Sequence, residues 1–325
     1  MEKPVVAVLT ADNESLPPGL EAVADTADLR LANSRESLES CLPVADVLLV
    51  TDFRTDILED CWHQASRLQW IHATSAGVDA LMFPELQRSN LPVTNARGVF
   101  DRPIAEFVLG LVLAFAKDIP ASVRYQDQHQ WQHRETETVR GKRALVVGAG
   151  AIGRQIGRML AAADMTVDAI ARTPRTDDPD FGQIHSNDSL LERLPEADFV
   201  IVAAPLTDDT RGLFGGKAFD AMKSTARFIN IGRGPIVDTD ALVQALESGS
   251  IAGAGLDVFE EEPLPENHPL WRFPQAILSA HMAGDVVGWQ AALTEQFLDN
   301  FRRWRAGEDL VNLVDKQQGY VPPLR

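Results

Sequence analysis

Two side chains with catalytic potential follow separate apolar runs in the second half of the sequence. Arg233 stands between glycines just after the run Phe228–Ile231, and His281 directly follows the run Ile277–Ala280. If both runs are parallel strands, both side chains lie at the carboxyl edge of one sheet, where open α/β sheets bind ligands. A guanidinium there could bind a carboxylate and polarise a neighbouring carbonyl, and an imidazole could transfer a proton near neutral pH.

Carboxylates lie between these two residues, in Asp257-Val258-Phe259-Glu260-Glu261-Glu262-Pro263. Glu260 and Glu261 are typical of a solvated loop. Glu262 could join Arg233 and His281 at neighbouring strand ends, which would complete a set of groups for proton-coupled hydride transfer. Two plainer alternatives stay open from the residues alone, because Arg233 could merely cap a turn and an isolated histidine such as His281 is more often structural.

A glycine-rich turn earlier in the chain predicts a nucleotide site. The apolar run Ala144–Val147 leads into Gly148-Ala149-Gly150-Ala151-Ile152-Gly153, and a helical pattern follows over Arg154–Ala163. Gly148 permits the tight turn, Gly150 lets the backbone approach phosphates, and Gly153 lets the helix pack close to the strand. The helix N-terminus, with Ala151 and Ile152, offers N–H groups and partial positive charge to a pyrophosphate. The alternative is a glycine-rich turn without a ligand.

The end of the next expected strand, Thr166–Ala171, bears on the choice of cofactor. An acid that would bind the ribose hydroxyls of NAD is expected there, but the chain continues as Arg172-Thr173-Pro174-Arg175. Two guanidiniums and a hydroxyl suit a 2′-phosphate, which a carboxylate would repel. This favours NADP (NADPH) as the cofactor, with NAD possible. A solvated loop with ordinary surface charges is the alternative.

Apolar runs alternate with helical patterns along most of the chain, which predicts an α/β fold with two doubly wound parallel-sheet domains. The glycine motif marks the first strand of its own domain, so the preceding α/β unit is a separate one. We expect residues 99–282 to form a dinucleotide-binding domain and residues 1–98 with 283–325 to form a discontinuous substrate domain. A crossing helix is expected at Ile104–Lys117, and a core-facing helix over Trp289–Trp304 is expected to return to the first domain. The expected strands are Val5–Leu9, Val44–Val50, Leu68–Ala73, Pro92–Thr94, Ala144–Val147, Thr166–Ala171, Phe199–Ala203, Phe228–Ile231, Gly255–Phe259 and Ile277–Ala280.

Composition narrows the class of protein. The chain has 325 residues and a formal net charge of −17, so it should repel nucleic acid and anionic membranes. The N-terminal residues lead straight into an expected strand without a signal peptide, and the longest apolar run is too short to cross a bilayer. Cys41 and Cys61 show no metal-ligand spacing and fit a reducing compartment. We therefore expect a cytoplasmic protein with no metal site and no nucleic-acid or membrane partner.

The three motifs around Arg233, Glu262 and His281, in their order and separations, resemble those of the D-isomer-specific 2-hydroxyacid dehydrogenases, with a leaning toward NADP-dependent glyoxylate/hydroxypyruvate reductases. The resemblance implies that these three residues form the active site and that Asp257 contacts the nicotinamide carboxamide. It implies a Rossmann nucleotide-binding domain inserted into a flavodoxin-like substrate domain. The implied reaction transfers hydride between NAD(P)H and a small 2-oxo acid, giving the D-2-hydroxy acid. Arg233 would stabilise the substrate oxygen, His281 would donate the proton, and Glu262 would orient the imidazole and favour its charged form.

The resemblance also extends to binding residues. The stretch Thr74–Asp79 is similar to the family's substrate loop, whose backbone N–H groups hold the substrate carboxylate. Arg54 follows the run Val44–Val50 and is expected to line the same cleft, unless it pairs on the surface with a neighbouring acid. Further cofactor contacts are expected at Ala204, Pro205, Thr210, Ile231, Gly232 and Gly284, and substrate contacts at Ser75, Ala76, Gly77 and Val78.

Two departures from the family pattern and two further expectations complete the analysis. Arg172 stands where the family usually has an acid, and Ala280 replaces the commoner proline before His281, with Met282 after it. The apolar segment Ile104–Ala116 together with Trp131 predicts a homodimer, although such a helix could be wholly internal. The alternative to an enzyme is an NAD(P)-sensing binding protein, similar to corepressors that resemble this family, with little turnover.

Overall fold

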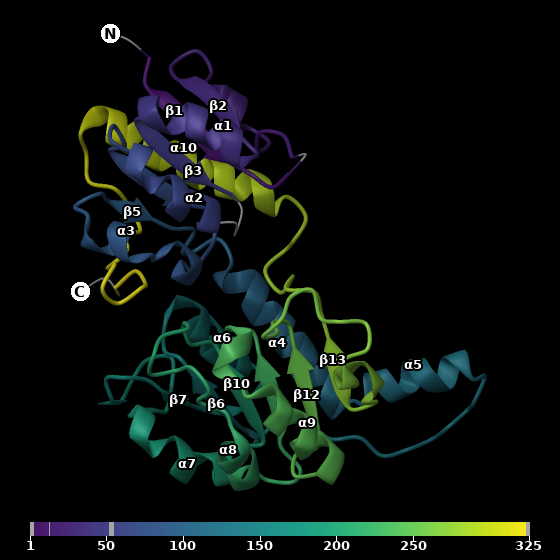
Figure 1. The fold of residues 1–325 in the computed structure, drawn as a ribbon. Coiled ribbons are helices and arrows are strands. Elements are labelled where there is room, and N and C mark those ends of the chain that lie inside the picture. The colour runs from purple at the N-terminus through teal and green to yellow at the C-terminus, as the bar shows by residue number, and fades with distance from the viewer. Residues whose placement is uncertain (1–2, 13, 52–54, 323–325) are drawn as a thin grey trace. The chain divides into compact units, whose positions relative to one another are not determined.

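The computed structural model describes residues 3–12, 14–51 and 55–322, which fold as two compact units. Unit 1 comprises residues 1–100 and 286–325, and unit 2 comprises residues 101–285. Each unit contains one sheet of parallel strands covered by helices (Figure 1), with a single antiparallel pairing at one edge of the larger sheet. The expected α/β class with two parallel-sheet domains is confirmed.

Unit 1 has a five-stranded sheet in the order β2-β1-β3-β4-β5. Its strands are β1 (Val5–Leu9), β2 (Asp28–Ala32), β3 (Val47–Val50), β4 (Trp70–Ala73) and β5 (Val93–Thr94). Its helices are α1 (Arg35–Cys41), α2 (Thr55–Cys61), α3 (Pro84–Arg88) and α10 (Trp289–Ala306). Every residue of β1, β3 and β4 is buried, as expected for parallel strands covered on both faces, which therefore read as continuous apolar runs.

The C-terminal helix α10 completes the core of unit 1. Phe297 and Phe301 are buried against residues of β1, β3 and β4, and the ring of Trp70 stacks on Phe297 with centroids 5.3 Å apart. The opposite face of the sheet packs against α1, α2 and α3. A helix from the end of the chain thus closes the sheet formed by its beginning.

Unit 2 has an eight-stranded sheet in the order β13-β12-β11-β10-β6-β7-β9-β8. Its strands are β6 (Arg143–Val147), β7 (Thr166–Ile170), β8 (Arg175–Thr176), β9 (Gln183–His185), β10 (Phe199–Val202), β11 (Arg227–Asn230), β12 (Gly253–Leu256) and β13 (Ala276–Leu278). Its helices are α4 (Asp101–Ala116), α5 (Ile119–Asp127), α6 (Ala151–Ala162), α7 (Leu190–Arg193), α8 (Gly216–Ala221) and α9 (Thr239–Ser248). The side chains of α4 and α6 share one core with the sheet, and those of α7, α8 and α9 share the other, which is the doubly wound arrangement.

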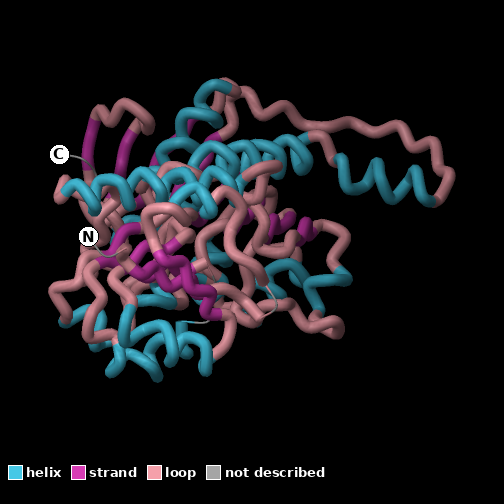
Figure 2. Tube along the Cα trace, turned by 90° about the horizontal axis from the view of Figure 1, so that it is seen from above, coloured by secondary structure: helices cyan, strands magenta, loops and turns pink. Residues whose placement is uncertain are grey.

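Helix α5 and the segment that follows it stand away from the rest of unit 2 (Figures 1 and 2). The segment is tied back at its end, where Glu137 accepts hydrogen bonds from Arg227 (2.6 Å) and Lys142 (2.5 Å). Along the projection, Ile119, Val123 and Trp131 expose 49%, 52% and 99% of their surface. These apolar side chains are candidates for contact with another protein chain.

The structure differs from the sequence-based expectations at a few elements. The strand expected at Gly255–Phe259 lies at Gly253–Leu256, because Asp257 and the residues after it leave the sheet. The edge strands β2 and β8, and β9 beside β8, were not expected. Charged residues in β2 and β8 obscure the apolar pattern, since these strands are half-buried or exposed. Within the described ranges, no helix is long and apolar enough to span a membrane.

Candidate active site

The turn that carries Arg233 is built by a buried amide and two glycines. Asn230 is buried at the end of β11, where its Oδ1 accepts a hydrogen bond from Gly232 N (3.0 Å) and its Nδ2 donates to Arg233 O (3.1 Å). A Cβ at Gly234 would lie 1.9 Å from the carbonyl carbon of Phe259, so this position accepts only glycine. The guanidinium of Arg233 donates from Nη1 to Gly232 O (2.9 Å). The backbone around Arg233 is therefore fixed before any ligand arrives.

Glu262 and His281 form an acid–base pair at the same edge of the sheet. His281 Nδ1 lies 2.8 Å from Glu262 Oε2, and the other carboxylate oxygen accepts a hydrogen bond from Phe259 N at 2.8 Å. The side chains of His281 and Glu262 are 37% and 36% exposed. With Nδ1 engaged by the carboxylate, the imidazole is oriented so that proton transfer to a substrate would use Nε2.

The carboxylate of Glu262 is held in its charged form. Partial burial opposes ionisation, but the hydrogen bonds from His281 and Phe259 and the charges of His281 and Arg233 outweigh it. The pKa of Glu262 is consequently lowered from its ordinary 4.5. At neutral pH this residue is an ionised partner for the imidazole.

Asp257 fixes the loop that presents His281. Its carboxylate is buried and accepts hydrogen bonds from Ser279 Oγ (2.6 Å), Met282 N (2.9 Å) and Ala283 N (3.0 Å), while its carbonyl oxygen accepts from His281 N (2.8 Å). His281 has φ +51°, a left-handed conformation that non-glycine residues rarely adopt. The hydrogen bonds to Asp257 hold this unfavourable backbone in place.

The glycine motif has the shape that a dinucleotide requires. Gly148 has φ +112°, and a Cβ there would lie 2.7 Å from the backbone of Ala203 and Ala204. At Gly153 a Cβ would lie 1.9 Å from Gly148 O. At Gly150, by contrast, no heavy atom that the structure describes lies within 4 Å of a built Cβ. Packing therefore explains two of the glycines, and the third faces open space at the N-terminus of α6, where a pyrophosphate would approach.

The remaining expected cofactor residues lie on loops at the carboxyl edge of the same sheet. Thr210 braces the loop after β10, where its hydroxyl donates to Pro205 O (2.7 Å) and accepts from Thr207 N (2.8 Å). A Cβ at Gly232 would lie 2.9 Å from Ala204 O. Gly284 follows the loop held by Asp257, Ile231 follows β11, and Ala151 and Ile152 form the first turn of α6. Unit 2 thus places these backbone segments beside the glycine motif and the arginine turn.

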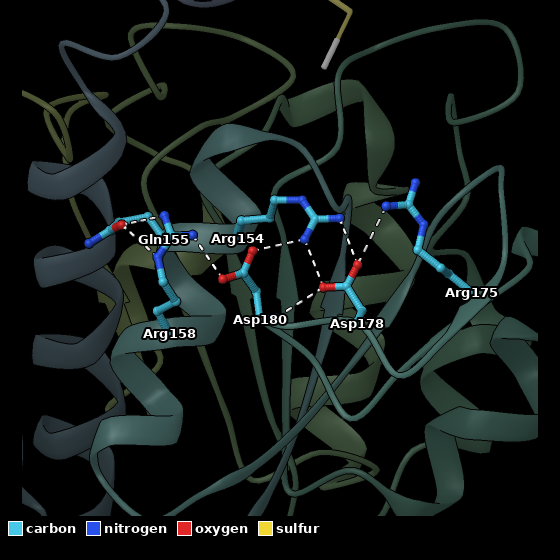
Figure 3. A network of polar contacts seen from close by, with 6 residues as sticks. All are labelled: Arg154, Gln155, Arg158, Arg175, Asp178 and Asp180. Atoms are coloured by element: carbon cyan, nitrogen blue, oxygen red, sulfur yellow. Dashed lines mark hydrogen bonds and ion pairs between the residues drawn. The ribbon is translucent and has the colours of Figure 1, made fainter. Parts of the chain in front are cut away.

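The expected 2′-phosphate residues Arg172, Thr173 and Arg175 lie on an exposed segment after β7. Arg175 opens β8, which pairs with β9 as a hairpin. Its Nη1 lies 3.7 Å from Oδ2 of Asp178, which belongs to a network of charged residues on the hairpin and α6 (Figure 3). Both arginines are exposed at the surface, and Asp178 lies near Arg175.

In unit 1 the expected substrate loop follows β4. Ser75 Oγ donates to Gly77 O (2.6 Å), Ser75 O accepts from Ala96 N (3.0 Å), and Asn95 Nδ2 donates to Ala76 O (2.5 Å). Val78 is buried in the core of this unit. The loop is therefore well braced. Arg54 lies outside the described residues, so its expected role in substrate binding stays a prediction.

Three positioning groups escaped the sequence analysis. Asn230 and Ser279 lay within the expected strands Phe228–Ile231 and Ile277–Ala280 but were given no role, and Asp178 was not singled out. For Asn230 the signal is an amide beside a glycine turn, since Asn side chains bond to the backbone of nearby residues. For Asp178 the signal is weak, because an acid in Asp177-Asp178-Pro179-Asp180 is typical of a solvated turn.

Sequence and structural matches agree with this geometry. The profile of the D-isomer specific 2-hydroxyacid dehydrogenase NAD binding domain matches residues 109–283. A glyoxylate reductase of Aeropyrum pernix is 33% identical, with 98% of this chain and 97% of the relative covered.

Two solved structures share the fold over nearly their whole length. A D-isomer specific 2-hydroxyacid dehydrogenase from Xanthobacter autotrophicus, in complex with NADPH and MES, superposes with a TM-score of 0.85 at 31% identity, covering 98% of this chain and 100% of the other. An NADPH-dependent glyoxylate/hydroxypyruvate reductase from Sinorhizobium meliloti, in complex with NADP and malonate, gives 0.84 at 26% identity and covers 99% and 100%. The chain belongs to the D-isomer specific 2-hydroxyacid dehydrogenase family and is an NAD(P)-dependent oxidoreductase.

Proposed function

We propose that the protein reduces a small 2-oxo acid, such as glyoxylate or hydroxypyruvate, to the D-2-hydroxy acid with NADPH. The observation that carries the proposal is the contact of Glu262 with His281 beside the arginine turn, 2.8 Å between carboxylate oxygen and imidazole nitrogen. Relatives named glyoxylate reductase support the substrate class. Unit 2 is proposed to bind the dinucleotide and unit 1 to supply further substrate contacts, including the backbone of residues 75–78.

The dinucleotide supplies the hydride from its nicotinamide ring. Arg233 binds the carboxylate of the oxo acid and stabilises the negative charge that develops on the ketone oxygen during reduction. His281 then donates a proton from Nε2 to that oxygen. Glu262 holds the ring in the correct orientation and stabilises its charged form. In the oxidative direction, His281 accepts the proton instead.

The proposed binding groups recognise the part that all 2-oxo acids share. The carboxylate and ketone of a 2-oxo acid meet Arg233 and His281, which leaves the side chain to be selected by neighbouring residues such as Met282. A panel of glyoxylate, hydroxypyruvate, phenylpyruvate and a branched 2-oxo acid, followed by the loss of NADPH absorbance, tests the proposal. Turnover of the smallest acids with D-hydroxy acid as product is expected. Tight NADPH binding without turnover of any oxo acid would instead support a nucleotide-sensing protein.

NADPH is proposed as the preferred reductant because Arg172 and Arg175 follow β7, where a ribose-binding acid is absent from the sequence between 171 and 176. Structural relatives were solved with NADP or NADPH bound. Losing a charge-assisted contact to phosphate costs roughly 1.5–3 kcal/mol, so NADPH should be favoured about tenfold or more. Arg172→Ala should remove much of that preference. Equal kcat/KM for NADH and NADPH in the unchanged protein would contradict it.

A homodimer is proposed from the projection formed by α5 and the segment after it. Helix α4 is buried along one face, at Ala105, Val108, Leu111, Val112 and Ala116. Its Leu113 is 39% exposed, and the exposed apolar surface continues at Ile119, Val123 and Trp131. A second copy of the chain would remove these side chains from water. Light scattering should give twice the chain mass at micromolar concentration, and Trp131→Asp should lower it. A monomer mass for the unchanged protein would reject the proposal.

A further inference from the structure

The hairpin that carries Arg175 is fastened to the helix of the glycine motif. Arg154, in the first turns of α6, donates from Nη1 and Nη2 to the two carboxylate oxygens of Asp178 at 2.7 and 2.9 Å. Its Nη1 also donates to Asp180 Oδ2 at 2.8 Å, and its guanidinium lies 5.6 Å from the ring centroid of Phe181. Figure 3 shows Arg154 between the two acids. This bidentate pairing fixes both the position and the orientation of the Asp178 carboxylate relative to Arg154.

Asp178 is the residue through which the fastening reaches Arg175. Its carboxylate is fully buried beneath Arg154. Burial opposes ionisation, but the hydrogen bonds from Arg154 outweigh it and lower the pKa of Asp178. Arg175 approaches the same carboxylate, with Nη1 3.7 Å from Oδ2, and its own side chain is 53% exposed. That distance is too long for a hydrogen bond. Asp178 therefore attracts the Arg175 guanidinium without satisfying its N–H groups.

The charges of this cluster do not cancel. Arg154, Arg158 and Arg175 meet the carboxylates of Asp178 and Asp180, and Arg158 is bound to Asp180 at 2.9 Å. The two acids are thus satisfied by the two arginines of α6, and the net positive charge that remains resides on Arg175 at the surface. An exposed guanidinium whose direction is set by a buried acid is prepared for a dianionic group such as a phosphate ester.

The fastening also fixes the hairpin relative to the N-terminus of α6. Phe181 is buried against α6, where a Cβ at Gly157 would lie 2.6 Å from its ring. The hairpin and the helix therefore behave as one piece. A ligand with one phosphate at the helix N-terminus and another near Arg175 would find both sites at a set separation.

We propose that Asp178, held by Arg154, is a positioning residue that sets the preference for NADP over NAD by presenting Arg175 to the 2′-phosphate. The inference rests on the proposed function, because it takes the hairpin to be the 2′-phosphate site. Asp178 acts through Arg175 and is not a catalytic residue.

Equilibrium binding of NADP⁺ and NAD⁺, measured by calorimetry on the full chain, tests this. Asp178→Asn keeps the size of the side chain and removes its charge. It should raise the Kd for NADP⁺ roughly three- to tenfold, where the upper value corresponds to the loss of one charge-assisted contact. The Kd for NAD⁺ should stay within about twofold. If Asp178 acted only as a nearby negative charge, its removal would tighten NADP⁺ binding. Tighter or unchanged NADP⁺ binding would overturn the inference.

The matched control is Asp180→Asn, which makes the same change beside the same Arg154 but has no described contact with Arg175. It should leave the ratio of the two Kd values within about twofold, and a shift as large as that of Asp178→Asn would overturn the role given to Asp178. If Asp178→Asn melts far below the parent, Arg154→Lys decides instead. Lysine keeps the charge but lacks the fork, and the same loss of NADP⁺ affinity is expected.

A double-mutant cycle with Arg175→Ala separates this inference from the proposed function. Arg175→Ala alone should weaken NADP⁺, and adding Asp178→Asn should then change nothing, since its effect passes through Arg175. Additive effects would overturn the positioning role while leaving NADP preference intact. If Arg175→Ala has no effect on NADP⁺ binding, the inference fails as well. Absence of oxo-acid reduction in a protein that passes these binding tests would contradict the proposed function alone.

Discussion

One histidine in each unit lies in or just after a strand of the parallel sheet, and the two experience opposite environments. In unit 1, His72 in β4 is fully buried, with Nδ1 2.8 Å from Thr94 Oγ1, and the described residues give its Nε2 no hydrogen-bond partner. In unit 2, His281 follows β13, is more than one-third exposed and contacts the carboxylate of Glu262. His72 stands within the expected strand Leu68–Ala73, and His281 directly follows the expected strand Ile277–Ala280. What surrounds the ring decides whether it can exchange a proton.

Burial alone accounts for the behaviour of His72. The aromatic rings of Trp70 and Phe297 lie 5.9 and 5.7 Å away, centroid to centroid, and none of the acids that the structure describes offsets the cost of a buried charge. Desolvation lowers its pKa from 6.5 to about 3. His72 is thus neutral at any pH at which the protein would work. The comparison teaches that a histidine of a parallel sheet is suited to acid–base chemistry when it has an adjacent ionised carboxylate and access to solvent.

Removing the exposed histidine should give the largest effect on activity. His281→Ala deletes the proton donor and should lower kcat for 2-oxo acid reduction by roughly 10²–10⁴, the usual range for loss of a general acid. Single-turnover and steady-state kinetics with NADPH would measure it. His72→Phe is the matched control and should leave kcat within about twofold. A loss of less than tenfold in His281→Ala would break the contrast between the two histidines.

The buried histidine should instead control stability in acid. Because the pKa of His72 is lowered in the folded protein, the unfolded chain binds a proton between pH 6.5 and about 3 that the folded chain does not. The free energy of unfolding should therefore decrease as the pH is lowered, approaching about 1.4 kcal/mol per pH unit, or about 2 kcal/mol in total between pH 6.5 and 4.5. Above pH 6.5 this contribution is constant. Urea unfolding at several pH values would measure it.

His72→Phe removes this titration and sharpens the comparison. Its stability should depend less on pH than that of the parent below pH 6.5, with the difference growing toward pH 4. At neutral pH the variant also removes a buried nitrogen that lacks a described partner, which offsets part of the lost bond to Thr94. Parallel pH dependence in the two proteins would show that His72 is protonated in the folded state.

A smaller change is expected on removing the charge that distinguishes His281. Glu262→Gln keeps an acceptor near Nδ1 but removes the negative charge beside the ring, so the alkaline limb of kcat/KM for reduction should move to lower pH. Since the pKa of Glu262 is lowered from 4.5, its carboxylate stays charged through the neutral range and is lost only in stronger acid. An unchanged pH profile in the variant would reject the pairing.

Much of the fold could be predicted from the sequence because its parallel strands are buried on both faces. Val5–Leu9 and Ala144–Val147 read as continuous apolar runs for that reason. Where one face meets solvent, as in β2 with its Asp28–Arg30 ion pair, the run is interrupted and the strand was missed. The strand before Asp257 was displaced by two residues, because Val258 and Phe259 continue the apolar run after the chain has left the sheet.

The candidate site could likewise be predicted only in part. Order and spacing suffice to bring Arg233, Glu262 and His281 to one edge of the sheet. They do not show how these residues are held, because the supporting side chains are of types that are also common in solvated turns and loops. Asp178 is buried only because Arg154, 24 residues earlier, covers its carboxylate. A pairing of this kind depends on the packing of a hairpin against a helix and leaves no local pattern.

The missing side chain at Gly234 links the parts of this site mechanically. The backbone of Phe259 lies against Gly234, Phe259 N donates a hydrogen bond to Glu262, and Glu262 contacts His281. The turn proposed to bind the carboxylate and the proposed proton donor therefore move as one body. For an engineer, the distance between anion binding and proton delivery is therefore not adjustable by changes near either residue. New substrates must be accommodated by changing the residues around the site. A single methyl group at position 234 would push the backbone of Phe259 away, and would thereby separate Arg233 from Glu262 and His281 without removing any of these side chains.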